Sequence, residues 1–166
     1  TVEMIVLEVL TEGHPHIEDI LGVPIVPILR SEHNLVILIL IVLLVNQGRL
    51  AEAQPLIEKA LAADPANLES GLLQLNTLLG RYPDKAAVLK LTQTLTAPYA
   101  NVAAARSVNA QAAWNAGNSA LALEEIRASL ALKPEWEPAA LFQGQILQQT
   151  SNAAAIAYFQ GYLKKW

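Results

Sequence analysis

The residues best suited to chemistry lie near the N-terminus. The segment His14-Pro15-His16 is followed by Glu18 and Asp19, and His33 is the remaining histidine. Histidine and carboxylate groups bind metals, but a complete site needs three or four converging ligands that neighbouring groups hold in place. Because two histidines separated by one residue fit a loop or an extended strand, we interpret them as surface loop residues. The sequence predicts no metal site.

The evidence for a catalytic site in the sequence is as weak as that for a metal site. Glu124 and Glu125 are adjacent, and neighbouring residues on a helix point about 100° apart, so the two carboxylates would not face each other. The chain has no glycine-rich phosphate loop, no Gly-x-Ser-x-Gly turn and no His-Glu-x-x-His pair. It also lacks cysteine, which excludes disulfides and thiol catalysis. We therefore predict that this chain is not an enzyme and binds no cofactor.

Composition narrows the class of protein further. The 166 residues are 53% hydrophobic and 16% charged, with a net charge of −4, which is typical of a packed globular domain. The longest basic run is Lys164-Lys165, too short to follow a nucleic-acid backbone, so we expect no nucleic-acid partner. The absence of cysteine is compatible with both cytoplasm and periplasm, and the alanine-rich, lysine-poor composition is typical of a bacterial protein.

One stretch is apolar enough that it could be mistaken for a transmembrane helix. Leu35 to Val45 is uninterrupted, but it has only about half of the ~20 residues that a bilayer crossing needs. The polar segments 30–34 and 46–48 prevent its extension on either side. The sequence therefore predicts a buried helix rather than a transmembrane one.

Small residues recur at a nearly constant interval along most of the chain. Alanines lie 34, 35 and 33 residues apart, and each is followed four residues later by an apolar residue: Ala53, Ala87, Ala122 and Ala155, then Ile57, Leu91, Ile126 and Phe159. Gly48 and Gly117 each precede an alanine by five residues. Because glycine is unfavourable inside a helix, this pattern predicts a repeated order of helix, tight turn, helix and turn.

This spacing resembles the tetratricopeptide repeat, and the match is best in QGRLAEAQPLIEKALAADPAN and AGNSALALEEIRASLALKPEW. The resemblance implies an all-α fold in which helical hairpins form a right-handed solenoid, the tetratricopeptide-like superhelix. Four repeats follow, at about 34–67, 68–102, 103–136 and 137–166, after an irregular segment at 1–33 that is a degenerate repeat or a cap. The small residue of the family's eighth position is present as Ala110 and Gly144 but is replaced by Ile41 and Leu75 in the first two repeats, where we expect looser packing.

The first helix of the repeat region is apolar on every face, whereas a solenoid helix normally exposes one face. We expect a cover over its apolar side chains, Leu35, Leu38, Ile39 and Val42. We favour the N-terminal segment as that cover. The alternative is a second copy of the chain, which would make a homodimer through the first repeat.

Members of this family hold extended peptides with the second, fifth, ninth, twelfth and thirteenth positions of each first helix. The ninth positions here are Val42, Asn76, Gln111 and Gln145, and three of these four are carboxamides. The surrounding positions contribute Glu69, Ser107, Trp114, Asn115, Gln148 and Gln149. Carboxamides match the donors and acceptors of a peptide backbone, and Trp114 could anchor one side chain. The plain alternative is that these residues only keep the surface soluble.

These features together predict a scaffold or adaptor that binds a protein or peptide partner. A lone Arg106 cannot form the carboxylate clamp by which some relatives hold chaperone tails. Two alternatives stay open: self-association through the apolar first repeat, and an accessory repeat region of a larger protein whose catalytic domain lies elsewhere.

Overall fold

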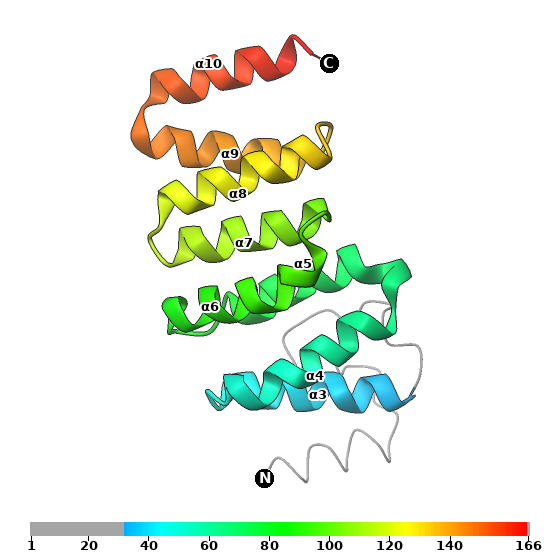
Figure 1. The fold of residues 1–166 in the computed structure, drawn as a ribbon. Coiled ribbons are helices and arrows are strands. Elements are labelled where there is room, and N and C mark those ends of the chain that lie inside the picture. The colour runs from blue at the N-terminus through cyan, green and yellow to red at the C-terminus, as the bar shows by residue number, and fades with distance from the viewer. Residues whose placement is uncertain (1–31, 166) are drawn as a thin grey trace, which may run out of the picture. The chain divides into compact units, whose positions relative to one another are not determined.

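The computed structural model describes residues 32–165, with side chains from Ile37 onward, and this part of the chain is helical throughout (Figure 1). The α-helices are α3 (Glu32–Asn46), α4 (Leu50–Ala63), α5 (Leu68–Leu79), α6 (Lys85–Thr96), α7 (Ala103–Asn115), α8 (Ser119–Leu132), α9 (Glu137–Thr150) and α10 (Asn152–Leu163). Two short 3₁₀ turns, η2 (Pro65–Asn67) and η3 (Ala97–Tyr99), join α4 to α5 and α6 to α7. The predicted all-α class is confirmed.

The starts of the described helices can be compared with the repeat starts placed from the sequence, and α3 begins at Glu32, before the predicted start at 34. Helices α5, α7 and α9 begin at Leu68, Ala103 and Glu137, where the sequence places the starts of new repeats. The irregular segment predicted at 1–33 lies outside the described residues, apart from the first two residues of α3. Among the described helices, none is long and apolar enough to cross a bilayer.

Two glycines make the turns that the pattern predicted. Gly48 and Gly117 have φ angles of 79° and 78°, a left-handed conformation that costs an L-residue with a side chain roughly 1–2 kcal/mol. After Gly117, the side chain of Asn118 accepts a hydrogen bond from Leu121 N at 3.1 Å and so caps α8. The turn before α10 has no glycine, and Ser151 alone makes it in an extended conformation, with its hydroxyl accepting from Ala154 N.

The chain divides into two compact units, residues 1–84 and 85–166, which we call the N-terminal and C-terminal units. In the described part of the N-terminal unit, α3, α4 and α5 pack against one another. Their core is built from large aliphatic side chains, among them Ile39, Val45, Ile57, Leu72 and Leu79.

The C-terminal unit contains α6 to α10, and each helix packs against the next. Its core is mostly small: Ala110, Ala113, Ala122 and Ala139 are buried with Ile126 and Ile146. Alanines at the crossing points let helix axes approach to about 8–10 Å. Close approach also brings α8 within reach of the start of α7, where the buried Ser129 hydroxyl donates to the carbonyl oxygen of Ala103 at 2.8 Å.

Candidate functional site

Helices α7 and α9 are the first helices of the third and fourth repeats, and they meet through their side chains. The rings of Trp114 and Phe142 meet edge to face, with centroids 6.1 Å apart and planes at 83°. Alanines from both helices share one buried cluster with Ile146. The side chains predicted to bind a peptide on α7 and on α9 therefore belong to neighbouring helices.

We call these side chains the amide surface: Ser107, Gln111, Trp114 and Asn115 on α7, with Gln145, Gln148 and Gln149 on α9. The glutamines of α9 and Asn115 are exposed, whereas the α7 residues Ser107, Gln111 and Trp114 are half-buried. Gln111 Nε2 donates to Asn115 Oδ1 at 3.2 Å, which ties two carboxamides one helical turn apart. The surface carries no ionisable side chain, so its recognition chemistry is hydrogen bonding and contact with one aromatic ring.

The nearest cation on α7 is already engaged. Arg106 Nη1 lies 3.2 Å from Glu125 Oε2 on α8, and Arg106 Nε donates to the carbonyl of Ala100 at 3.0 Å. This pairing orients the guanidinium toward α8 and η3. Arg106 is thus a structural link between helices.

Sequence reasoning missed one apolar residue in this region. Leu141 lies four residues before Gln145 on α9 and is 49% exposed. Its position was available from the repeat spacing, because Leu141 is the fifth residue of the fourth repeat, as Ser107 is of the third. It adds an exposed aliphatic contact one turn from the carboxamides.

The remaining predicted partner-binding residues, Glu69 and Asn76, lie on α5 in the N-terminal unit. Glu69 is exposed and Asn76 is half-buried. The positions around Asn76 that would complete a groove are filled by Leu72 and Leu79, which are both buried. Helix α5 therefore offers fewer accessible polar contacts than α7 and α9.

Three of the four α3 residues predicted to be covered have described side chains, and these are buried or half-buried, whereas Leu40 on the same helix is 42% exposed. Ile39 and Val42 are only 1% and 2% exposed, and Leu38 is half-buried, while the side chain of Leu35 lies outside the described residues. Neither Ile39 nor Val42 presents exposed area for self-association in this structure.

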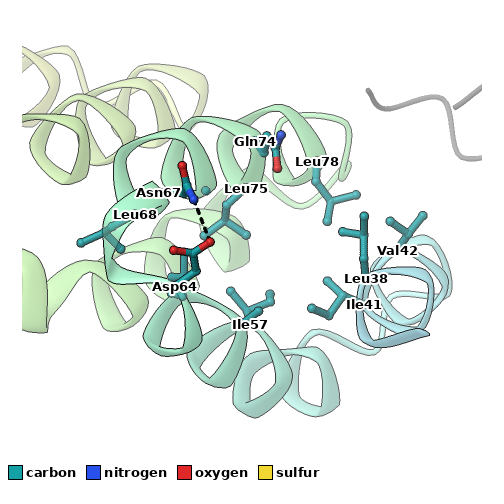
Figure 2. Close-up of a pocket in the computed structure, with 13 residues that line it drawn as sticks. Leu38, Ile41, Val42, Ile57, Asp64, Asn67, Leu68, Gln74, Leu75 and Leu78 are labelled. Carbon is teal, nitrogen blue, oxygen red and sulfur yellow. Dashed lines mark hydrogen bonds between the residues drawn. The ribbon is translucent and has the colours of Figure 1, made fainter. Parts of the chain in front are cut away.

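Leu38 and Val42 instead line a cavity of about 80 Å³ between α3, α4 and α5, which we call the first-repeat pocket (Figure 2). Aliphatic side chains from all three helices surround it, including Ile41, Ile57, Leu75 and Leu78. Ile41 and Leu75 are the large residues at the eighth positions, so the cavity coincides with the looser packing expected from the sequence.

The polar groups of the pocket are few. Asn67 Nδ2 donates to Asp64 Oδ2 at 2.8 Å, as Figure 2 shows. Gln74 Nε2 is buried and has no hydrogen-bond partner in the structure. Gln74 was not singled out from the sequence, although its repeat position holds Asn109 and Gln143 in the next two repeats. This second carboxamide series was a signal that could have indicated it.

No cluster of three or more potential metal ligands occurs among the described residues. The segment with His14, His16, Glu18 and Asp19 lies outside them, as does the side chain of His33. Glu124 is exposed, while Glu125 pairs with Arg106, so the two carboxylates have different surroundings.

No protein-family model and no curated protein matches the sequence. Solved structures do match. One described as "MamA 41-end from Desulfovibrio magneticus RS-1" has a TM-score of 0.55 at 17% identity over 98% of this chain and 92% of that chain. Another, "MamA RS-1 ArsTM double mutant", has a TM-score of 0.54 at 16% identity over 98% of this chain and 91% of that chain. This chain therefore has a tetratricopeptide-like helical-repeat fold.

Proposed function

We propose that the chain is a protein-interaction adaptor whose C-terminal unit holds an extended peptide on the amide surface of α7 and α9. The observation that carries the proposal is the uncharged carboxamide series on α7 and α9, two helices that meet through Trp114 and Phe142, with Gln111 and Gln145 at matching repeat positions. The tetratricopeptide-like fold supports an interaction role rather than a catalytic one.

The chemistry of the surface favours backbone recognition. Each carboxamide offers a donor pair and an acceptor, the complement of the C=O and N–H groups of an extended chain. Trp114 is held by Phe142, so its ring can accept a side chain with little loss of rotamer freedom. We therefore expect tolerance toward peptide sequence, with a preference for an apolar or cationic residue near Trp114 and an aliphatic one near Leu141.

The test is selection of peptides from a random 12-residue display library on the full chain, followed by titration of selected peptides. The double variant Gln111→Ala/Gln145→Ala should weaken binding about tenfold or more, because two backbone hydrogen bonds are lost. Gln160→Ala is the matched control, since Gln160 is an exposed glutamine on α10, outside the amide surface. Melting temperatures of all variants are compared first.

Equal binding by the parent, the double variant and the control would contradict the proposal and leave the glutamines as solubility residues. Selection of peptides that compete with one another and lose affinity only in the double variant would support it. Light scattering in the same buffers separates peptide binding from self-association of the chain.

A further inference from the structure

We propose that a cleft formed by α8, α9 and α10 binds a small carboxylate that carries an aromatic ring. Gln143 on α9 hydrogen-bonds the carboxylate, Lys165 attracts it, and two tyrosines of α10 contact the ring. We call this site the C-terminal cleft. It lies on a different side of α9 from the amide surface, because Gln143 and Gln145 are two residues apart and such positions do not face the same way on a helix.

Gln143 is a buried polar side chain without a partner in the protein. It is only 7% exposed, and its carboxamide forms no hydrogen bond with a described residue. Its oxygen and nitrogen are still accessible, because the fully enclosed, unpartnered polar atoms of the described side chains are Gln74 Nε2 and Tyr158 Oη. Gln143 lines the C-terminal cleft, so its accessible amide faces that space. A buried amide without a hydrogen bond is unfavourable and indicates a ligand that supplies one.

The cleft is large enough for a small molecule and is open to solvent. Its volume of about 420 Å³ lies within the ~300–1,000 Å³ that is typical of small-molecule sites. Ala157 and Gly161, one turn apart on α10, both line it, and a Cβ placed on Gly161 would have no atom within 4 Å. Both residues are exposed, so the cleft opens along this part of α10. A ligand can enter there without separation of the helices.

Two tyrosines give the cleft an aromatic wall. Tyr158 and Tyr162 are one turn apart on α10, with ring centroids separated by 6.4 Å and planes at 33°. Tyr158 Oη is enclosed, so Tyr158 contacts the cleft through its ring. Leu130 and Pro134 add apolar surface. Because aromatic rings attract one another by more than their buried area alone provides, a ring is a better match than an alkyl chain.

The charge of the lining favours a carboxylate over an amine. Lys165 contributes an ammonium group, and no aspartate or glutamate is among the described residues that line the cleft. Lys165 is exposed and makes no ion pair with a described residue. A carboxylate can accept a hydrogen bond from Gln143 and is attracted by Lys165, whereas an ammonium ligand would be repelled.

The experiment is a methyl-detected NMR titration of the full chain, labelled at the methyl groups of alanine and leucine. The probe is 3-phenylpropionate, compared with 3-phenylpropanamide, which has no charge, and hexanoate, which has no ring. We expect saturable ring-current shifts at Leu130 and Ala157 with 3-phenylpropionate, and weaker binding of both comparison compounds. A tripeptide that ends in phenylalanine with a free carboxylate is titrated in parallel, because its relative affinity distinguishes a peptide terminus from a free acid as the source of the ligand.

Two pairs of variants test the contacts. Gln143→Leu keeps the volume but removes the hydrogen bond, so it should weaken 3-phenylpropionate binding about tenfold. Gln93→Leu on α6 is its control, because Gln93 is exposed and outside the cleft. Lys165→Met should weaken 3-phenylpropionate by about two- to fivefold and leave 3-phenylpropanamide unchanged. Lys164→Met is the matched control, since Lys164 is an exposed neighbour that does not line the cleft.

The proposal is overturned if neither 3-phenylpropionate nor the tripeptide gives saturable shifts at Leu130 and Ala157, or if all three small compounds bind equally well. Equal weakening by Lys165→Met and Lys164→Met would also overturn it, because net charge rather than a contact in the cleft would then attract the ligand. Should Gln143→Leu fail to fold, the comparison of the two lysine variants still decides the question. Gln111→Ala/Gln145→Ala should give the parent's titration, so failure of the amide surface is distinguishable from failure here.

Discussion

Two glycines in the last helical hairpin have different surroundings, so replacing each by alanine should have opposite effects on the stability of the protein. Gly144 on α9 faces Phe159 of α10, and a Cβ placed on it would lie 1.9 Å from Phe159 Cζ, 2.4 Å from Cε2 and 2.7 Å from Cε1. Gly161 on α10 has no atom within 4 Å of such a Cβ. We expect Gly144→Ala to destabilise the protein and Gly161→Ala to stabilise it.

The magnitudes follow from two opposing terms. Non-bonded carbon atoms prefer about 3.5–4.0 Å, so the Phe159 ring must move by more than about 1 Å to admit the methyl group of Gly144→Ala. Overpacking of this kind costs about 1–3 kcal/mol. Replacing glycine by alanine inside a helix regains roughly 0.5–1 kcal/mol. The net expectation is a loss of about 1–2 kcal/mol for Gly144→Ala and a gain of about 0.5 kcal/mol for Gly161→Ala, which lies in the last turn of its helix.

The assay is urea unfolding followed by far-ultraviolet circular dichroism, with the free energy of unfolding taken from midpoint and slope. A double-mutant cycle with Phe159→Ala isolates the steric term. In that background Gly144→Ala should become stabilising, because the ring that it displaces is absent. If Gly144→Ala raised stability in the parent as much as Gly161→Ala does, the close packing of α9 on α10 through this glycine would be refuted.

Two further predictions concern the C-terminal unit. Ala122 is fully buried, so Ala122→Leu should lower the free energy of unfolding by about 1–3 kcal/mol in the same urea assay, and an unchanged midpoint would contradict the close helix contact. Burial of the phenol raises the pKa of Tyr158 above its usual value of 10.0, and the nearby Tyr162 raises it further by a smaller amount. The unfolded chain therefore loses the Tyr158 proton at lower pH than the folded chain, and stability should fall as the pH rises above about 10. Melting curves between about pH 9 and 11 should show a smaller fall for Tyr158→Phe than for the parent, and parallel falls in both would show that Tyr158 does not contribute.

The repeat architecture was readable from sequence because its determinants are local. Helical periodicity needs only residues three and four apart, and a tight turn needs only a glycine that tolerates positive φ. Gly48 and Gly117 meet that need. The register implied by the tetratricopeptide resemblance put repeat starts at 68, 103 and 137, where α5, α7 and α9 begin. The carboxamide positions on α7 and α9 followed from the groove positions that the tetratricopeptide resemblance implies, so the members of the candidate surface could be named before their arrangement was known.

Which side chains are buried, and which hydrogen-bond partners they have, depended on the tertiary structure. Val42 occupies a groove position in the sequence register, yet it is almost fully buried and lines the first-repeat pocket. Gln74 has no distinguishing feature in the sequence of its helix, yet its amide nitrogen is buried without a hydrogen-bond partner in the structure. The physical reason is that backbone conformation depends mainly on neighbouring residues, whereas the surroundings of a side chain are set by helices distant in sequence. Local sequence was enough to predict the helical repeats, the glycine turns and the carboxamides of the amide surface, whereas packing between helices sets which side chains are enclosed and where a cavity remains.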